Sequence, residues 1–456
     1  MTVRYKHAVV IGGSMAGLLA ARVLADHAAQ VTLVERDLLP DGPEDRKGVP
    51  QARHVHVLLT RGAQALDELF PGFLADVEAA GATRLDQTRD FRTLQFGFWK
   101  PRYESGSPMF CMSRPFVEHH VRERVRRLPN VRVLEQASVE GLVSSPDHAY
   151  VRGVRVQRGG QEEQLEADLV VDASGRGTRA PKWLESLGYG APEVSTLQVD
   201  LAYASRAYRM PAEPPDWKAL TVTTAPPLLR NGVVTPIEGG RWMVTLWGYF
   251  GDHPQADPEG FDAFARSLPV PDMADALQHA EPLTQVSVFK YAGYLRRHYE
   301  RMPRFPEGYV VLGDAACSFN PIYGQGMTTA ALEALELRAC LREGDGQGLS
   351  RRFQKRLSKV VDTPWQLATS GDLGYPQVEG NRPAAMLWAG KYVQRLLAVA
   401  RHDPEVDRVF LEVKDMVKPP SALFAPWILW RVLTSRPSAP EASASPSSGD
   451  PKRKAA

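Results

Sequence analysis

Glycines between an apolar segment and a helix-like segment can bring the backbone close to a phosphate group. Residues 9–17 read Val-Val-Ile-Gly-Gly-Ser-Met-Ala-Gly. Glycine permits a sharp turn and a close approach, and a helix that follows directs free N–H groups at the phosphates. The pattern predicts a dinucleotide-binding turn, although a serine stands where the middle glycine is usual. The residues expected around the pyrophosphate are Gly12, Gly13, Ser14, Ala16 and Gly17.

An acidic residue follows this turn at the distance that a dinucleotide site needs. Glu35 ends the next apolar segment, about 20 residues on, where a carboxylate would accept hydrogen bonds from the adenosine ribose. We expect Glu35 and the adjacent Arg36 to belong to the nucleotide site. The first motif alone does not distinguish FAD from NAD.

A second motif, in residues 308–327, distinguishes the two cofactors. An apolar strand pattern ends in Gly313-Asp314, and a loop rich in proline and glycine then enters a helix. An aspartate at a strand end can accept hydrogen bonds from ribityl hydroxyls. The helix start can face the pyrimidine edge of a flavin, where negative charge gathers on reduction. The two motifs predict FAD, held in this half by Gly313, Asp314, Pro321, Gly324, Gln325, Gly326 and Met327.

The second motif resembles the second FAD fingerprint of the p-hydroxybenzoate hydroxylase-like (group A) flavoprotein monooxygenases. Residues 46–56, 172–179 and 320–324 further resemble bacterial flavin epoxidases of polyketide and polyether pathways, which are similar to squalene epoxidase. The resemblance runs from about residue 5 to about residue 380. One departure is Ser174-Gly175, where the hydroxylases usually carry Asp-Gly, and it leaves open how, or whether, NADPH docks directly.

The resemblance implies roles for individual residues. Arg53 would lie beside the flavin, and Arg114 would contact the FAD phosphates through its forked donors. The backbone from Gly324 to Met327 would stabilise the flavin. We therefore expect a catalytic set of Arg53, Tyr323 and Gly324. The paired His54 and His56 are better explained by loop packing than by catalysis.

The resemblance also implies an activity. The protein would be an FAD-dependent monooxygenase, an epoxidase or hydroxylase, acting on an apolar polyketide- or terpenoid-like intermediate of bacterial secondary metabolism through a flavin C4a-hydroperoxide. Electrons would come from NAD(P)H or from a separate flavin reductase. The main alternative is a redox-neutral FAD-dependent cyclase, such as a decalin-forming enzyme, in which FAD is structural. A reductase of prenyl double bonds is a third possibility. A halogenase is disfavoured because Lys100 lies outside any Trp-rich halogenase signature.

The segments around the motifs indicate an α/β protein with a Rossmann-type FAD-binding domain, an inserted mixed β-sheet substrate domain and a C-terminal helical region. Residues 7–11 and 31–34 have buried-strand patterns with a helical pattern between them. Further helices are predicted at 60–70, at 115–127, with several arginines on its outer face, and at 327–342. The expected domains are the FAD-binding domain (1–90, 112–195 and 285–345), the substrate domain (91–111 and 196–284), the helical region (346–435) and a disordered tail (436–456).

Composition excludes several classes of function. The 55 basic and 53 acidic side chains give a net charge of +2, so no strong field points to nucleic acid. The three cysteines are far apart, which argues against disulfides or zinc and fits the cytoplasm. No apolar run is long enough to span a membrane, and residues 424–433 favour packing on the protein over peripheral membrane contact. Five aromatic residues could line an apolar pocket or fill a sheet core, namely Trp99, Tyr103, Trp242, Trp247 and Tyr249.

Overall fold

A five-stranded parallel sheet carries both predicted motifs. The computed structural model describes residues 3–344 and 346–435. Four of these strands are wholly or mostly buried runs, as expected where both faces of a parallel sheet are covered. The strand order is β21 (Tyr309–Val311), β12 (Leu169–Asp172), β1 (Tyr5–Ile11), β2 (Ala28–Val34) and β8 (Val131–Leu134).

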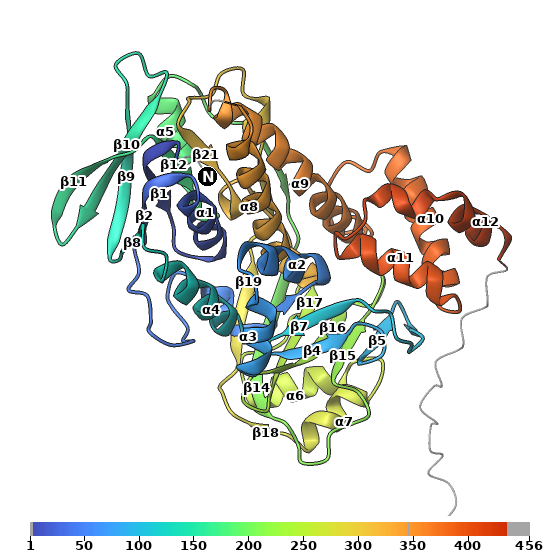
Figure 1. The fold of residues 1–456 in the computed structure, drawn as a ribbon. Coiled ribbons are helices and arrows are strands. Elements are labelled where there is room, and N and C mark those ends of the chain that lie inside the picture. The colour runs from blue at the N-terminus through green and yellow to red at the C-terminus, as the bar shows by residue number, and fades with distance from the viewer. Residues whose placement is uncertain (1–2, 345, 436–456) are drawn as a thin grey trace, which may run out of the picture.

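Helices follow β1 and β21 and pack against one another. α1 lies beside α8, which also contacts α2 and α9, as Figure 1 shows. Ser113 caps α4 by accepting a hydrogen bond from the Phe116 N–H, which fixes where that helix begins. The helices of this part are α1 (Met15–Ala25), α2 (Thr60–Leu69), α3 (Phe73–Ala79), α4 (Arg114–Arg126), α5 (Ala180–Ser186), α8 (Gly326–Arg342) and α9 (Leu349–Asp372).

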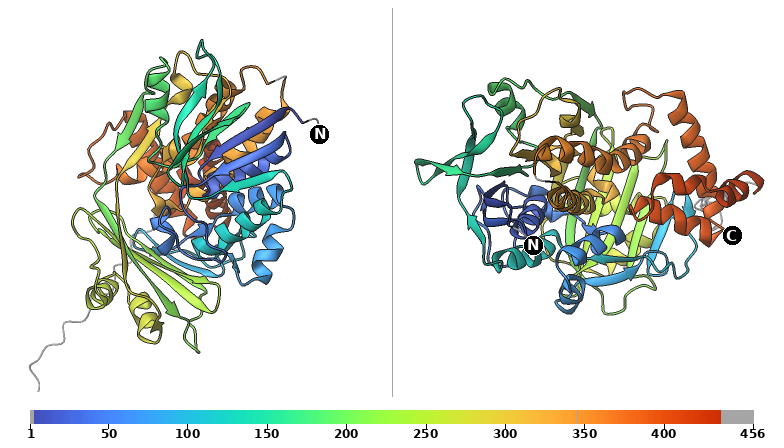
Figure 2. Two further views of the ribbon diagram at one scale, coloured as in Figure 1. Left: turned by 90° about the vertical axis from the view of Figure 1, so that its left-hand side faces the viewer. Right: turned by 45° about the horizontal axis from the view of Figure 1, so that its top comes forward.

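An eight-stranded mixed sheet forms a second layer, with two short helices on its outer side (Figure 2). The helices α6 (Pro258–Arg266) and α7 (Asp272–Gln278) share a hydrophobic cluster with this sheet. β19 (Ser287–Tyr291) pairs with β14 beside the main path. That path runs β18 (Glu281–Pro282), β14 (Leu201–Arg209), β17 (Arg241–Tyr249), β16 (Arg230–Ile237), β15 (Ala219–Thr223), β5 (Phe91–Gln95) and β6 (Phe98–Trp99).

Three small sheets complete the β-structure. A meander packs against β12 through β10. A second small sheet includes β7, which leads into α4. In a third, β22, which lies within the second motif, pairs with β20. The strands are β9 (Ala137–Ser144), β10 (Val151–Arg158) and β11 (Gln161–Glu166); β3 (Val57–Leu58), β7 (Pro108–Cys111) and β4 (Thr83–Asp86); and β13 (Val194–Leu197), β20 (Tyr294–Arg297) and β22 (Cys317–Ser318).

The C-terminal helices form a separate small cluster at one side of the molecule (Figure 1). α10 (Ala384–Ala400), α11 (Pro404–Lys414) and α12 (Pro426–Thr434) share a core of their own that includes Leu396 and Ile428. The predicted tail, 436–456, lies outside the described residues. No described helix is long and apolar enough to cross a membrane.

The predicted fold class is confirmed, and the three predicted helices match α2, α4 and α8 within one residue at each end. One expectation about α4 was wrong. Arg122 is buried rather than on an outer face. Arg122 donates to the carbonyls of Pro40 and Gly42, at 2.6 and 3.0 Å. Arg122 is buried because its guanidinium supplies donors to carbonyl groups of the loop that follows β2.

Candidate FAD site and active site

The turn after β1 is too tight for side chains. Gly12 has a φ of 100°, and its N–H donates to the Val34 carbonyl at 2.8 Å. A Cβ at Gly12 would overlap the carbonyl oxygen of Ala173, and a Cβ at Gly17 would overlap that of Gly12. The first motif therefore packs β1, α1 and the end of β12 together through backbone alone.

The N-terminus of α1 is open. Ser14 precedes the helix, but its hydroxyl donates to Glu118 Oε2 at 3.2 Å and accepts from Arg114 Nη2 at 2.8 Å. Among the described residues, no side chain caps this first turn and no acidic residue lies in it. Its N–H groups and partial positive charge are therefore available to a phosphate.

Two buried arginines flank this helix start. Arg114, from α4, and Arg46, from the loop after β2, share Glu118, with N–O distances of 2.7 and 2.8 Å. Arg114 Nη1 and Arg46 Nη2 are buried and have no partner among the described residues. Buried guanidinium donors are normally satisfied, so two unpaired donors beside an open helix start fit the FAD pyrophosphate.

Glu35 lies where the first motif predicts it, at the end of β2. Its Oε2 accepts the Gly13 N–H at 2.7 Å, and its Oε1 accepts the Asp37 N–H at 3.0 Å. Arg46 lies 3.4 Å from the same carboxylate. Glu35 thus stabilises the glycine turn by a hydrogen bond. Arg36, which was also expected in the nucleotide site, is exposed.

The second motif approaches the first. Gly313, with a φ of 65°, lies so close to Ala16 that a Cβ would come within 2.8 Å of the Ala16 side chain. The Asp314 side chain is exposed to solvent. The protein packed around it nevertheless raises the pKa of its carboxyl group, and the charges of Arg176 and Arg114 oppose this effect. A Cβ at Gly326 would meet no other atom, and no described side chain caps the start of α8. An accessible carboxylate and an open start of α8 fit the ribityl chain and the pyrimidine edge of FAD.

The loop between these points, residues 320–325, is held from two sides. Gly324 is left-handed, with a φ of 70°, and its N–H donates to the Pro321 carbonyl at 2.9 Å. The Tyr323 hydroxyl donates to Asp372, at the end of α9, at 3.1 Å. The Gln325 side chain donates to the Lys414 carbonyl, at the end of α11, at 3.0 Å. α9 and α11 therefore both contact the loop at residues 320–325.

α11 also contacts the segment that follows β6 and, through Asp415, the start of α2. Lys100 pairs with the buried Asp407 at 2.5 Å, and the Tyr103 hydroxyl donates to the same carboxylate at 3.0 Å. Asp415, just after the helix, accepts from Thr60 at 3.1 Å and from the Gln87 side chain. Lys100, considered from the sequence as a halogenase-type lysine, thus forms an ion pair with α11.

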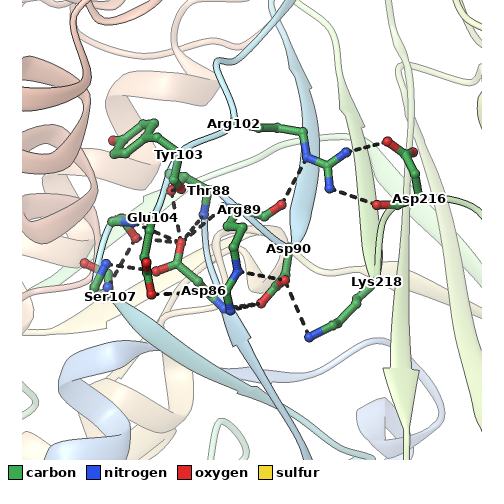
Figure 3. Close-up of polar contacts among 12 residues, drawn as sticks. Asp86, Thr88, Arg89, Asp90, Arg102, Tyr103, Glu104, Ser107, Asp216 and Lys218 are labelled. Atoms are coloured by element: carbon green, nitrogen blue, oxygen red, sulfur yellow. Dashed lines mark hydrogen bonds and ion pairs between the residues drawn. The ribbon is translucent and has the colours of Figure 1, made fainter.

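The turn that presents these contacts is built around Asp86 (Figure 3). Its carboxylate accepts the Thr88 and Arg89 N–H groups, each at 3.1 Å, and the Ser105 hydroxyl at 3.0 Å. Burial alone would raise the pKa of Asp86, but these donors lower it to about 2. The Asp90 carboxylate accepts the Asp86 N–H at 2.9 Å and closes the turn.

The other predicted residues fall in different environments. Arg53 ends a short helical turn, with a side chain that is 61% exposed and lies 3.0 Å from Asp45. Met327 is half-buried in the first turn of α8. His54 is buried and its Nδ1 lies 2.8 Å from the Ser205 hydroxyl. Burial lowers its pKa to about 3, so it is neutral and ties the loop to β14.

The five predicted aromatic residues do not share one environment. Trp242 is fully buried and stacks on Trp217 at 5.6 Å, within the cluster under α6 and α7. Trp99 is exposed beneath Arg92. Tyr249 is buried on the side that faces α9 and stacks on Tyr375 at 4.6 Å. Tyr103 contacts α11, and Trp247 is buried in the main core.

Three buried carboxylates of the site were not identified from the sequence. Glu118 follows Arg114 by four residues, a spacing that places both on one helix face and could have indicated the pair. Glu333 is the acidic residue among alanines on the buried side of α8. Asp372 ends α9 with no recognisable motif around it. Among the described residues, no group of acidic, histidine or cysteine side chains could hold a metal ion.

Comparison with known families identifies the larger part of the chain. The family model described as an FAD binding domain matches residues 5–352. A protein of Mycobacterium tuberculosis, Rv3254, is 34% identical over 425 residues, which cover 89% of this chain and 88% of the relative. The 6-methylpretetramide 4-monooxygenase of Streptomyces rimosus is 26% identical over 75% of this chain and 77% of that enzyme. The kynurenine 3-monooxygenase of Salinispora tropica is 28% identical over 75% and 74%.

Solved structures show the same fold. A flavoprotein/dehydrogenase of Cytophaga hutchinsonii superimposes with a TM-score of 0.68 and 17% identity, over 93% of this chain and 96% of that one. PqsL, a probable FAD-dependent monooxygenase of Pseudomonas aeruginosa, gives a TM-score of 0.61 and 18% identity, over 80% and 97%. These comparisons give no support to the redox-neutral cyclase considered from the sequence.

Proposed function

This chain belongs to the FAD-binding domain family of flavin-dependent monooxygenases, and from that premise we propose that it inserts one oxygen atom into an apolar polyketide- or terpenoid-like intermediate. Two features support the proposal. The first is the uncapped start of α1, which is flanked by unpaired arginine donors. The second is the accessible Asp314 beside the open start of α8. Together they fit the pyrophosphate and the flavin half of one FAD.

The reaction balances as a two-electron oxygenation. One atom of O2 enters an alkene, giving an epoxide, or an electron-rich carbon, giving an alcohol or phenol. The other atom leaves as water, with two electrons from NAD(P)H, used directly or through a flavin reductase, and one proton from solvent. Bound FAD supplies the redox chemistry, and the protein supplies orientation and a dry environment.

The residues of the chain have distinct tasks in this proposal. Arg114 and Arg46 hold the pyrophosphate, and Asp314 accepts from the ribityl hydroxyls. The N-terminus of α8 stabilises negative charge at the pyrimidine edge. The backbone at Tyr323 and Gly324 would lie beside the bound flavin, and Arg53 would flank it from the exposed loop.

Aromatic side chains that pack beside the loop at His54 support an apolar substrate class. Tyr203 and Phe289 stack with ring centres 5.3 Å apart, and His54 packs edge-on against Tyr203 at 4.6 Å. These rings extend from β14 and β19, the strands that face the histidine loop. The Streptomyces rimosus relative is named for the oxygenation of 6-methylpretetramide.

The experiment is oxygen transfer with a labelled oxidant. The purified protein is incubated with NADPH, a flavin reductase, isotopically labelled O2 and a panel of polycyclic aromatic and polyene compounds. A product that gains one labelled oxygen atom supports the proposal. Cyclised product of unchanged mass, or oxidation in which the label goes only to hydrogen peroxide, contradicts it.

A further inference from the structure

Asp372, the last residue of α9, is a buried carboxylate saturated with donors. It is 0% exposed. Its Oδ2 accepts from the Tyr294 hydroxyl at 2.6 Å and from the Asn320 side-chain amide at 2.9 Å. Its Oδ1 accepts from the Tyr323 and Tyr249 hydroxyls, at 3.1 and 3.2 Å. Three phenols and one amide thus converge on one carboxyl group.

This geometry suits an ionised carboxylate. An ionised carboxylate offers about four acceptor positions and no donor, and here four donors fill them. Burial raises the pKa of Asp372, and the four hydrogen bonds oppose that effect. Among the described residues, no basic side chain pairs with it, so neutral donors alone stabilise the charge. Removing the negative charge would leave donors facing a poorer acceptor.

The four donors come from three parts of the fold. Tyr249 ends β17 of the eight-stranded sheet, and Tyr294 begins β20. Asn320 and Tyr323 belong to the loop that leads into α8, and Asn320 also accepts the Ile322 N–H at 3.2 Å. Asp372 therefore holds the 320–325 loop at Asn320 and Tyr323 and, through Tyr249, connects this loop to the eight-stranded sheet.

The backbone beside Asp372 is shaped to admit Tyr323. A Cβ at Gly371 would overlap the Tyr323 hydroxyl. Gly371 has helical backbone within α9, so alanine suits its conformation and favours the helix more than glycine does. A substitution there would disturb Tyr323 without weakening the helix.

We propose that Asp372 is a positioning residue that sets the conformation of the 320–324 loop against FAD. The inference rests on the FAD site proposed above, but it does not depend on which substrate is oxygenated. It assigns to the end of a C-terminal helix the task of holding the loop that faces the flavin. Loss of this anchor is expected to alter how FAD is held even where the protein remains folded.

The test measures FAD affinity and the visible circular dichroism of bound FAD in the full-length protein and four variants. Asp372→Asn is expected to weaken FAD binding by about 10- to 100-fold, and Tyr323→Phe and Gly371→Ala by about three- to tenfold. All three change the dichroism of bound FAD. The matched control is Tyr249→Phe, which removes the same phenol–carboxylate bond on the sheet side and is expected to stay within about twofold of wild type.

The outcomes separate positioning from stability. If Asp372→Asn does not fold, Tyr323→Phe and Gly371→Ala decide the question. If these variants melt at lower temperature but bind FAD with wild-type affinity and spectrum, the inference is overturned. A wild-type protein that binds no FAD overturns the inference and the proposed function together. FAD binding without oxygen transfer contradicts only the proposed function.

Discussion

Glu333, on the buried side of α8, accepts the backbone N–H of Gly313, with Oε2 and N 2.6 Å apart. Its other oxygen has no partner among the described residues. Burial raises the pKa of Glu333 to about 8, although the Gly313 N–H opposes that effect. A protonated, neutral carboxyl group therefore holds the strand end that presents Asp314 to the cofactor.

This raised pKa predicts that stability falls as pH rises. The folded protein keeps the proton on Glu333 up to about pH 8, whereas the unfolded chain loses it near pH 4.5. The contribution is full below the unfolded pKa and is lost between those values, with a slope of up to about 1.4 kcal/mol per pH unit. Glu333→Gln should flatten this slope. Urea unfolding of both proteins across this range measures it, and equal slopes would contradict the assignment.

Asp86 predicts the opposite pH dependence. Its pKa of about 2 lies below the model-compound value of 3.8, so its stabilisation is present above that value and is lost as pH falls towards 2. Asp86→Asn should destabilise the protein by about 2 kcal/mol at neutral pH and reduce the loss in acid. The exposed Asp216→Asn serves as control and should cost about 0.5 kcal/mol or less. Chemical denaturation at several acidic pH values checks both.

Arg114 predicts a loss of FAD affinity. Arg114→Met removes the unpaired donor beside the α1 start, so the dissociation constant for FAD should rise by about 10- to 100-fold. Arg124→Met, on the same helix, removes an arginine that pairs with Asp76 at the surface and should leave FAD affinity unchanged. Titration of apoprotein with FAD compares them, and equal effects would place Arg114 outside the site.

The Lys100–Asp407 pair predicts how firmly the C-terminal helices are attached. Asp407→Asn leaves Lys100 largely buried without its partner, and burial already lowers the pKa of Lys100. We expect a loss of about 3 kcal/mol, partly restored when Lys100→Met is added. Calorimetry of the single and double variants gives the coupling energy. Additive losses would show that the pair carries no interaction of its own.

Arg53 offers a separation of function from stability. Because its side chain is 61% exposed and pairs with Asp45 at the surface, Arg53→Ala should change the unfolding free energy by about 0.5 kcal/mol or less. If Arg53 flanks the flavin, the rate of NAD(P)H-dependent oxygen uptake should fall by about tenfold or more at unchanged melting temperature. An unchanged rate would remove Arg53 from the catalytic set.

Local motifs made the FAD half of the fold predictable. The glycine turn and Glu35 act within one βαβ unit, and Gly313 and Asp314 end one strand, so their spacing in sequence reflects their spacing in the fold. The continuous apolar runs of β1 and β21 indicated a sheet that is covered on both faces.

The rest of the site depends on contacts that sequence spacing does not encode. Asp372 and Tyr249 are 123 positions apart, and Gln325 and Lys414 are 89 apart. Single acidic residues such as Glu333 and Asp372 follow no period or motif, so only the packing of α8 and α9 reveals them. Arg122 was placed on an outer face because charge usually lies outside, whereas loop carbonyls hold it inside.

The proposed function requires that this chain binds FAD and uses it as a redox catalyst. The visible absorption of flavin in purified protein, under anaerobic conditions, with NADPH alone and with an added flavin reductase, tests this requirement. We expect at least one donor to bleach the oxidised flavin band and oxygen then to restore it. A bound flavin that stays oxidised with both donors would show that FAD is not a redox catalyst in this protein.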